Sequence, residues 1–179
     1  MQEGFPLQKT REWTEAYTIR RYGLAAPGVT DEQRQAATAA WNILLPNSYS
    51  GYMGLATTSW IRRSIITVRP LFNLSQETIQ PSGPLVDAWQ QLQAVNQAKL
   101  GSFRYDLVDV GRQVMSNLFL DVYSLWQSAF VTKDAACRGL STSMLELIAD
   151  WDTLLLNHEA YCFGRWIADA RRCAMGNAE

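Results

Sequence analysis

FRYDLVDVGRQ, residues 103–113, opens the longest uninterrupted helical pattern in the sequence. Ser102 is the expected N-cap, and Asp106 and Asp109 fall in or near the first turn, where carboxylates offset the positive end of the helix dipole. Arg112 follows Asp109 by three residues, so the two side chains can pair along the helix. Apolar side chains then recur at every third or fourth position, so they share one helix face. The members of this face are Leu107, Val110, Val114, Met115, Leu118, Phe119, Val122, Tyr123 and Trp126.

Five further helices are expected around this central one. The first ends at Gly23, which suits the position just past a helix C-terminus. The second opens with a capping box formed by Thr30 and Gln33, and it should stop before Pro46. A break at 132–134 separates the central helix from the next one. The expected ranges are 10–22, 30–45, 85–98, from that break to about 156, and 161–175.

Together these patterns predict an all-α fold. Two long helices joined by a short break should lie antiparallel and form an α-hairpin. Residues 47–83 are interrupted repeatedly by glycine and proline, so they should form one long loop. We therefore expect residues 1–179 to form a single domain, an irregular antiparallel bundle of six helices around one shared apolar interior.

Composition excludes several classes of function. The formal net charge is −1 and the basic residues form no stripe with interleaved aromatics, so nucleic acid is not an expected partner. No run of apolar residues approaches the length of a membrane span. The first eleven residues are polar and lack a signal-peptide pattern, which leaves the compartment unknown.

The seven tryptophans are large potential core anchors. Trp60 lies in the predicted loop, outside any helical stripe. The other six occupy inward spacing within their helices, and they are Trp13, Trp41, Trp89, Trp126, Trp151 and Trp166. The sequence therefore favours Trp60 over the others as a ligand-facing ring.

The three cysteines and the single histidine form no pattern of metal ligands. We expect no metal or cofactor, and buried thiols are the default interpretation of the cysteines. Cys162 and Cys173 could pair only in an oxidising compartment. His158 is expected at a helix junction, where it is either solvated or caps a helix.

Candidate acid–base pairs are better explained by helix structure than by catalysis. Glycoside hydrolysis needs two carboxyl groups on opposite sides of a sugar bond. Asp106 and Asp109 point from the same turn toward the same side, and Glu12 with Glu15 fails for the same reason. Glu146 and Asp150 belong to the outer face of the fifth helix. We therefore predict no catalytic residue in this chain.

Several stretches resemble a known family and follow its order along the chain. Among them are residues 103–113, Trp13-x-x-x-Tyr17-x-x-Arg20-Arg21-Tyr22-Gly23, and Gly164-x-Trp166-Ile167-x-x-Ala170-Arg171. They resemble the C-terminal all-α domain of the α-N-acetylglucosaminidases, glycoside hydrolases that remove terminal α-linked N-acetylglucosamine. In that family two glutamates on a (β/α)₈ barrel carry out the retaining chemistry, and the later one precedes the helix that resembles residues 13–23.

The resemblance implies a domain without its own catalytic machinery. We expect most of a C-terminal helical domain, which hydrolyses no bond itself but packs on a barrel and helps to form its sugar cleft. An uncovered apolar face would then bind either that barrel or a second copy of the chain. The alternative is a stand-alone helical interaction or carbohydrate-binding module that has lost the barrel.

A third hypothesis is a generic helical scaffold, which would scatter Arg20, Arg21, Tyr105 and Arg112 over the surface. The family hypothesis instead brings several of them to one polar seam. Ile61 stands where family members often have a polar residue, which weakens any sugar contact from this loop. Asn73 begins a glycosylation sequon. The residues expected to face substrate or barrel are Trp60, Arg62, Arg63, Tyr105 and Arg112.

Overall fold

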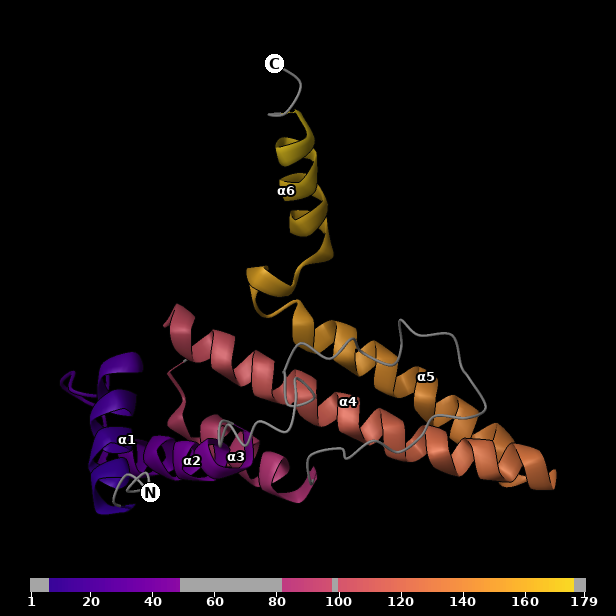
Figure 1. Cartoon of the computed structure of the whole chain (residues 1–179), viewed down its shortest axis with the longest axis horizontal. Helices are drawn as coiled ribbons and strands as arrows, with labels where there is room; N and C mark the ends of the chain where they lie inside the picture. Colours follow the sequence, from indigo (N-terminus) through magenta and orange to yellow (C-terminus); the bar gives the residue numbers. More distant parts are fainter. Residues whose placement is uncertain (1–6, 49–81, 98–99, 176–179) are drawn as a thin grey trace, which may run out of the picture.

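The computed structural model describes residues 7–48, 82–97 and 100–175, and most of these residues are helical (Figure 1). The predicted all-α class is confirmed. The predicted loop at 47–83 lies largely outside the described residues. The elements in chain order are α1 (Leu7–Arg21), α2 (Asp31–Ser48), α3 (Ser82–Val95), α4 (Gly101–Thr132), α5 (Ala136–Leu155), the short 3₁₀ helix η3 (Glu159–Tyr161) and α6 (Phe163–Met175).

The helices form two packed groups joined by α4. Figure 1 shows α1, α2 and α3 gathered at the first half of α4, while α5 runs back along the second half. The antiparallel α4–α5 hairpin confirms the prediction from the short break. The closest packing occurs between α1 and α2, α2 and α3, α3 and α4, and α4 and α5. Beyond η3, α6 leaves the hairpin at a steep angle (Figure 1).

The buried side chains form two separate clusters, so the expectation of one shared interior is wrong. The N-terminal core lies among α1, α2, α3 and the start of α4, and its members are Tyr22, Leu24, Ala36, Ala37, Ala40, Trp41, Leu44, Leu85, Ala88, Leu92, Val95, Phe103, Val110 and Val114. The hairpin core lies between α4 and α5 and consists of Phe119, Tyr123, Leu147 and Trp151. The cause is the length of α4, whose 32 residues extend well beyond the helices that cover its first half.

Two local signals in the sequence produce the helix boundaries that they predict. Gly23 has φ +59°, and the next backbone N–H, of Leu24, donates to Ile19 O at 2.9 Å, which closes the end of α1. At the start of α2, Thr30 N–H donates to Gln33 Oε1 at 3.0 Å and Gln33 N–H donates to Thr30 Oγ1 at 3.3 Å. This reciprocal pair is the predicted capping box.

Other boundaries differ from the sequence prediction. Pro46 lies inside the last turn of α2, which continues to Ser48. Ser102 does not cap α4, because the helix already begins at Gly101 and its N-cap, Leu100, makes no side-chain cap bond. The Ser102 hydroxyl instead donates to Arg21 O at 2.6 Å and so ties the end of α1 to the start of α4.

The buried face of α1 also differs from the prediction. Trp13 was expected to point inward, but half of its surface is exposed, whereas Thr14 and Thr18 are fully buried. The Oγ1 atoms of Thr18 and Thr38 lie 3.4 Å apart. Small side chains at this contact let α1 and α2 approach closely, which leaves the larger ring outside on Tyr17, with the two ring centroids 4.9 Å apart.

Two further positions with inward spacing are exposed. Leu118 is 45% exposed on α4, and Trp166 is 58% exposed on α6. Both have helical spacing that fits a buried stripe, and α6 is not among the closely packed helix pairs of the described residues. Glu146 and Asp150 are exposed on α5, as predicted.

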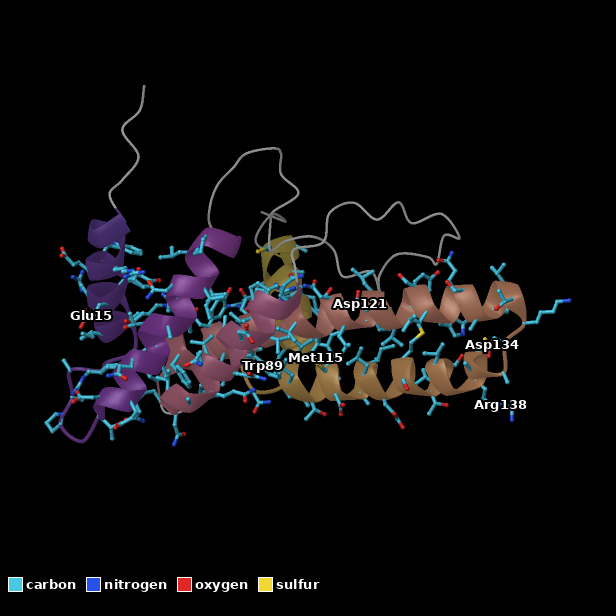
Figure 2. The ribbon with its side chains drawn as sticks, turned by 90° about the horizontal axis from the view of Figure 1, so that it is seen from below. Glu15, Trp89, Met115, Asp121, Asp134 and Arg138 are labelled. Carbon is cyan, nitrogen blue, oxygen red and sulfur yellow. The ribbon has the colours of Figure 1, made fainter. Side chains whose placement is uncertain are left out.

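Helices α3, α4 and α5 meet closely at Gly111. A Cβ atom added there would lie 2.7 Å from Trp89 Nε1 and 3.0 Å from Leu154 Cδ2. The Trp89 ring is held in place because its Nε1–H donates to Leu107 O at 3.1 Å. Figure 2 shows the side chain of Met115 between α4 and α5, one turn further along the same interface. Glycine is therefore required at this crossing.

We expect Gly111→Ala to lower the free energy of unfolding by about 1 kcal/mol or more, because overpacking exceeds the gain in helix propensity. Gly139→Ala on α5 is the matched control, since a Cβ there meets no described atom within 4 Å and should be neutral or slightly stabilising. Urea denaturation followed by circular dichroism measures both. Equal effects of the two substitutions would contradict the packing argument.

Candidate functional site

The first three turns of α4 carry two polar clusters that join it to distant parts of the chain. The first, called the Asp106 network, consists of Arg21, Tyr22, Trp41 and Asp106. Arg21 donates to both carboxylate oxygens of Asp106, with distances of 2.5 and 2.6 Å. The Tyr22 hydroxyl donates to Asp106 Oδ2 at 2.8 Å and accepts from Trp41 Nε1 at 2.8 Å.

The Asp106 network is buried, so each of its polar groups needs a hydrogen-bond partner within the protein. Tyr22 is completely buried and Asp106 is only 9% exposed. Burial, together with the negative charge of Asp106, raises the pKa of Tyr22 far above its usual value. The bidentate contact with Asp106 raises the pKa of Arg21. Asp106 therefore links α1 to α4, and it lies just beyond the first turn of α4, which contains no acidic residue.

The second group, called the Asp109 cluster, consists of Tyr105, Asp109, Arg112, His158 and Tyr161. Arg112 Nη2 lies 2.9 Å from Asp109 Oδ1, which confirms the predicted pair. The Tyr161 hydroxyl donates to the same oxygen at 2.9 Å. The ring of Tyr161 stacks on Tyr105 with centroids 5.4 Å apart, and the Arg112 guanidinium lies 5.9 Å from its centroid.

His158 completes the Asp109 cluster from the junction between α5 and α6. Its ring meets Tyr105 edge to face, with centroids 5.3 Å apart. Its Nδ1 accepts the backbone N–H of Ala160 at 3.2 Å, so His158 caps η3, which confirms its predicted position at a helix junction. Burial raises the pKa of the Tyr161 hydroxyl, and its contacts with Tyr105 and Asp109 add to this effect.

The two clusters match the predicted polar seam only in part. Arg21 joins the Asp106 network, Tyr105 and Arg112 join the Asp109 cluster, and Arg20 is exposed. Three of the four predicted residues therefore converge on the same end of α4, in two neighbouring groups instead of one seam. Both carboxylates are held by an arginine and a tyrosine, an arrangement that orients helices.

The apolar face of α6 is a different kind of candidate site. Every described side chain from 163 to 174 is exposed except that of Asp169, which is partly exposed. Phe163, Trp166 and Ile167 follow the spacing of one helix face, and Phe163 is 72% exposed. Arg165 and Arg172 lie on the other side of the helix with Asp169. The described part of α6 therefore exposes an apolar face to solvent.

A pocket of about 310 Å³ lies where α3, α4 and α5 meet. Arg104 at its rim donates to Asn157 O, and the described walls are mainly apolar. They consist of Trp89, Gln93, Phe103, Arg104, Leu107, Val108, Leu154 and Asn157. These residues supply no pair of acid–base groups.

Four of the predicted site residues lie outside the described ranges. Trp60, Arg62, Arg63 and Asn73 all belong to 49–81, which the structure does not describe.

The cysteines differ from their default interpretation. All three are free thiols, and none is fully buried, since Cys137 and Cys162 are partly exposed and Cys173 is exposed. Cys162 and Cys173 are separated along a path that is mostly α6, about 16 Å of helix, which is beyond the reach of a disulfide. Buried thiols are therefore the wrong expectation for this chain.

Among residues 7–48, 82–97 and 100–175, no group of three histidine, cysteine, aspartate or glutamate side chains could hold a metal ion. Of the helices in the same ranges, none has the length and apolar character needed to cross a membrane.

Tyr161 is the residue of the Asp109 cluster that sequence reasoning missed. It falls in the predicted last helix, where its hydroxyl has no evident partner, and the aspartate that it contacts lies 52 positions earlier. A break in periodicity between residues 156 and 163 is the signal that could have separated η3 from α6.

We expect Asp106→Asn to lower the free energy of unfolding by about 2 kcal/mol, because Arg21 would lose its charged partner in a mostly buried site. Asp31→Asn is the matched control, since Asp31 pairs with Arg34 but its side chain is 83% exposed. That substitution should cost less than about 1 kcal/mol. Urea denaturation of the two variants side by side makes the comparison, and an equal loss would argue against the Asp106 network.

The raised pKa of Tyr22 predicts alkaline destabilisation. In the unfolded chain this tyrosine ionises near pH 10, while in the folded protein it stays protonated. Its contribution is therefore complete below about pH 10 and declines as the pH rises further, by about 1.4 kcal/mol per pH unit. Unfolding free energies at about pH 8 and pH 11 should show a shallower decline for Tyr22→Phe than for the parent protein. An unchanged slope would contradict this assignment.

Comparisons with known proteins agree with the resemblance noted in the motifs. The model of the alpha-N-acetylglucosaminidase (NAGLU) C-terminal domain matches residues 13–179. Human alpha-N-acetylglucosaminidase is 29% identical over 178 residues, which cover 97% of this chain and 23% of the human protein. The chain thus spans less than a quarter of that relative, and no solved structure matches it. Because the family model covers nearly the whole sequence, the chain belongs to the alpha-N-acetylglucosaminidase C-terminal domain family.

Proposed function

We propose that this chain acts as the C-terminal helical domain of an α-N-acetylglucosaminidase-like glycoside hydrolase, packing on a catalytic barrel and helping to form its sugar cleft. Family membership supports the domain assignment. The single observation that favours a docked domain is the exposed apolar face of α6, which carries Phe163, Trp166 and Ile167. The human relative has more than three-quarters of its length outside the match, which is ample to cover such a face.

Physical reasoning also favours a partner for α6. Burying an apolar side chain of this size contributes roughly 1.5–3 kcal/mol, and a short helix has little stability without such burial. Trp166 is the central side chain of the face, with 58% of its surface available. We therefore assign the partner surface to the remainder of the hydrolase, with α6 as the principal contact.

The paired carboxylates support a non-catalytic role for this part of the enzyme. Asp106 and Asp109 are both bound by arginine and tyrosine side chains, and the contacts with Arg21, Tyr22 and Tyr161 join α4 to other parts of the chain. Barrel-facing roles for Trp60, Arg62, Arg63, Tyr105 and Arg112 remain part of this proposal. Chemistry at the sugar bond would then come from the glutamates of the barrel.

The test begins with the coding sequence on both sides of the chain. We expect it to encode a barrel with two opposed glutamates. The barrel and this chain, joined in one polypeptide, should hydrolyse an aryl α-N-acetylglucosaminide. The hydrolysis rate of this chain alone should not exceed that of its Asp106→Asn and Asp109→Asn double variant. Activity of the isolated chain above that variant, or the absence of a barrel, would overturn the proposal.

The α6 contact has its own measurement. Titration calorimetry of the separate barrel with this chain should show at least tenfold weaker binding for Trp166→Ser and for Ile167→Ser. Leu145→Ser is the matched control, because Leu145 is an apolar side chain with 69% exposure on α5 and should leave the affinity unchanged. Equal affinities for all variants would exclude α6 as the contact.

A stand-alone interaction or carbohydrate-binding module is the second candidate, and the same apolar face favours it if no barrel is encoded nearby. Self-association through α6 is then the expected behaviour. Sedimentation velocity of the parent chain and of Trp166→Ser tests this self-association. The coding sequence on both sides of the chain distinguishes the two candidates, since only the first one requires a barrel.

A further inference from the structure

The direction of α6 needs a physical explanation. It is a helix of 13 residues whose described side chains are nearly all exposed, and it is not among the closely packed helix pairs. Isolated helices of this length are marginal in water, and an unpacked helix has no surface contact to fix its angle. The junction of residues 156–162 must therefore set the angle between α6 and the α4–α5 hairpin.

That junction is fastened to α4 by the Asp109 cluster. Tyr161 makes three contacts there: a hydrogen bond to Asp109, a stacked contact with Tyr105, and a cation–π contact with Arg112. Asp109 and Arg112 are each only 19% exposed at the side chain, so this ion pair is partly shielded from solvent. A shielded pair of this kind gives the hydroxyl of Tyr161 a fixed and charged acceptor.

The other side of the junction is fastened to α6. Trp166 Nε1–H donates to Ala160 O at 2.7 Å. The guanidinium of Arg165 lies 2.7 Å from Glu159 Oε1. Both bonds reach from the first turn of α6 back to η3. The 3₁₀ turn is thus bound on one side to α4 and on the other to α6.

From this arrangement we infer that Tyr161 is a positioning residue that holds α6 at a fixed angle to the hairpin. Its contacts hold η3 to α4, and its neighbours Ala160 and Glu159 bond η3 to the first turn of α6. The benefit to barrel docking rests on the proposed function above, because a fixed angle presents the apolar face of α6 ready to bind. The angle itself is a property of this chain and can be measured without any barrel.

The Tyr161 hydroxyl is well suited to this role. Burial, Tyr105 and Asp109 all raise its pKa, so it remains a donor throughout the ordinary pH range. Asp109 is then shared between Arg112 and Tyr161, and the loss of either donor leaves the other contact in place. The stacked Tyr105 ring adds a directional contact to the hydrogen bond, which restricts rotation of the junction.

Pulsed electron double resonance between two spin labels measures the distribution of distances between α6 and the hairpin, and its width reports how firmly the angle is fixed. Cys173, which is exposed on α6, takes one label. Asp150→Cys on the outer face of α5 takes the other, in a background with Cys137→Ser and Cys162→Ser. We expect one narrow distance distribution in this protein and a distribution at least twice as wide in Tyr161→Phe, with further widening in Tyr161→Ala.

Tyr123→Phe is the matched control. It makes the same chemical change on a buried tyrosine of α4 whose hydroxyl has no hydrogen-bond partner among the described residues, so the distribution should stay narrow. Asp109→Asn, which keeps an acceptor for Tyr161, should widen the distribution less than Asp109→Ala. Circular dichroism verifies that each variant is folded, and the Phe variant decides the result if Tyr161→Ala fails to fold.

Equal widths for the parent, Tyr161→Phe and Tyr123→Phe would overturn the inference. A broad distribution in the parent protein would overturn it as well, because α6 would then have no fixed angle to set. Neither outcome depends on whether a barrel binds, so a failure here is distinct from a failure of the proposed function. A widened distribution with unchanged barrel affinity would confirm the positioning role and deny its importance for docking.

Discussion

The bidentate contact between Arg21 and Asp106 is the interaction on which the rest of the structure depends. It joins the end of the first helix to the start of the longest one, and Tyr22 carries the same contact inward to Trp41 on α2. A buried carboxylate with three donors excludes alternative packings of these helices, because any other arrangement would leave a charge unpaired in an apolar region. The N-terminal core can therefore form only with α1, α2 and α4 in this relation.

From this end, the long helix α4 extends past the N-terminal core, and the other helices contact it at successive positions along its length. Its first half closes the N-terminal core, its second half pairs with α5, and its early turns also hold the junction that leads to α6. The fold thus separates a packed platform from a projecting helix. The human member of the family is more than four times the length of this match, so most of that protein lies outside this domain.

Local features of this fold could be predicted from sequence, and distant contacts could not. The capping box at Thr30 and the left-handed conformation of Gly23 depend only on residues a few positions away, so the local sequence predicts both. Arg21 lies 85 positions from Asp106 and Tyr161 lies 52 positions from Asp109, and helical periodicity does not predict either contact. Helical spacing also misassigned Trp13 and Trp166, because it identifies an apolar face without saying whether this chain covers it.

The hydrogen bond from the indole of Trp166 to the carbonyl of Ala160 limits how that ring can move. Most surface tryptophans sample several rotamers, and association then costs about 0.5–1.5 kcal/mol for each side chain that becomes immobile. Here the indole is already fixed by its own backbone neighbour, so its broad plane faces solvent in one orientation. A surface that binds this ring therefore meets a flat apolar side chain whose loss of rotamer freedom already occurred when the chain folded.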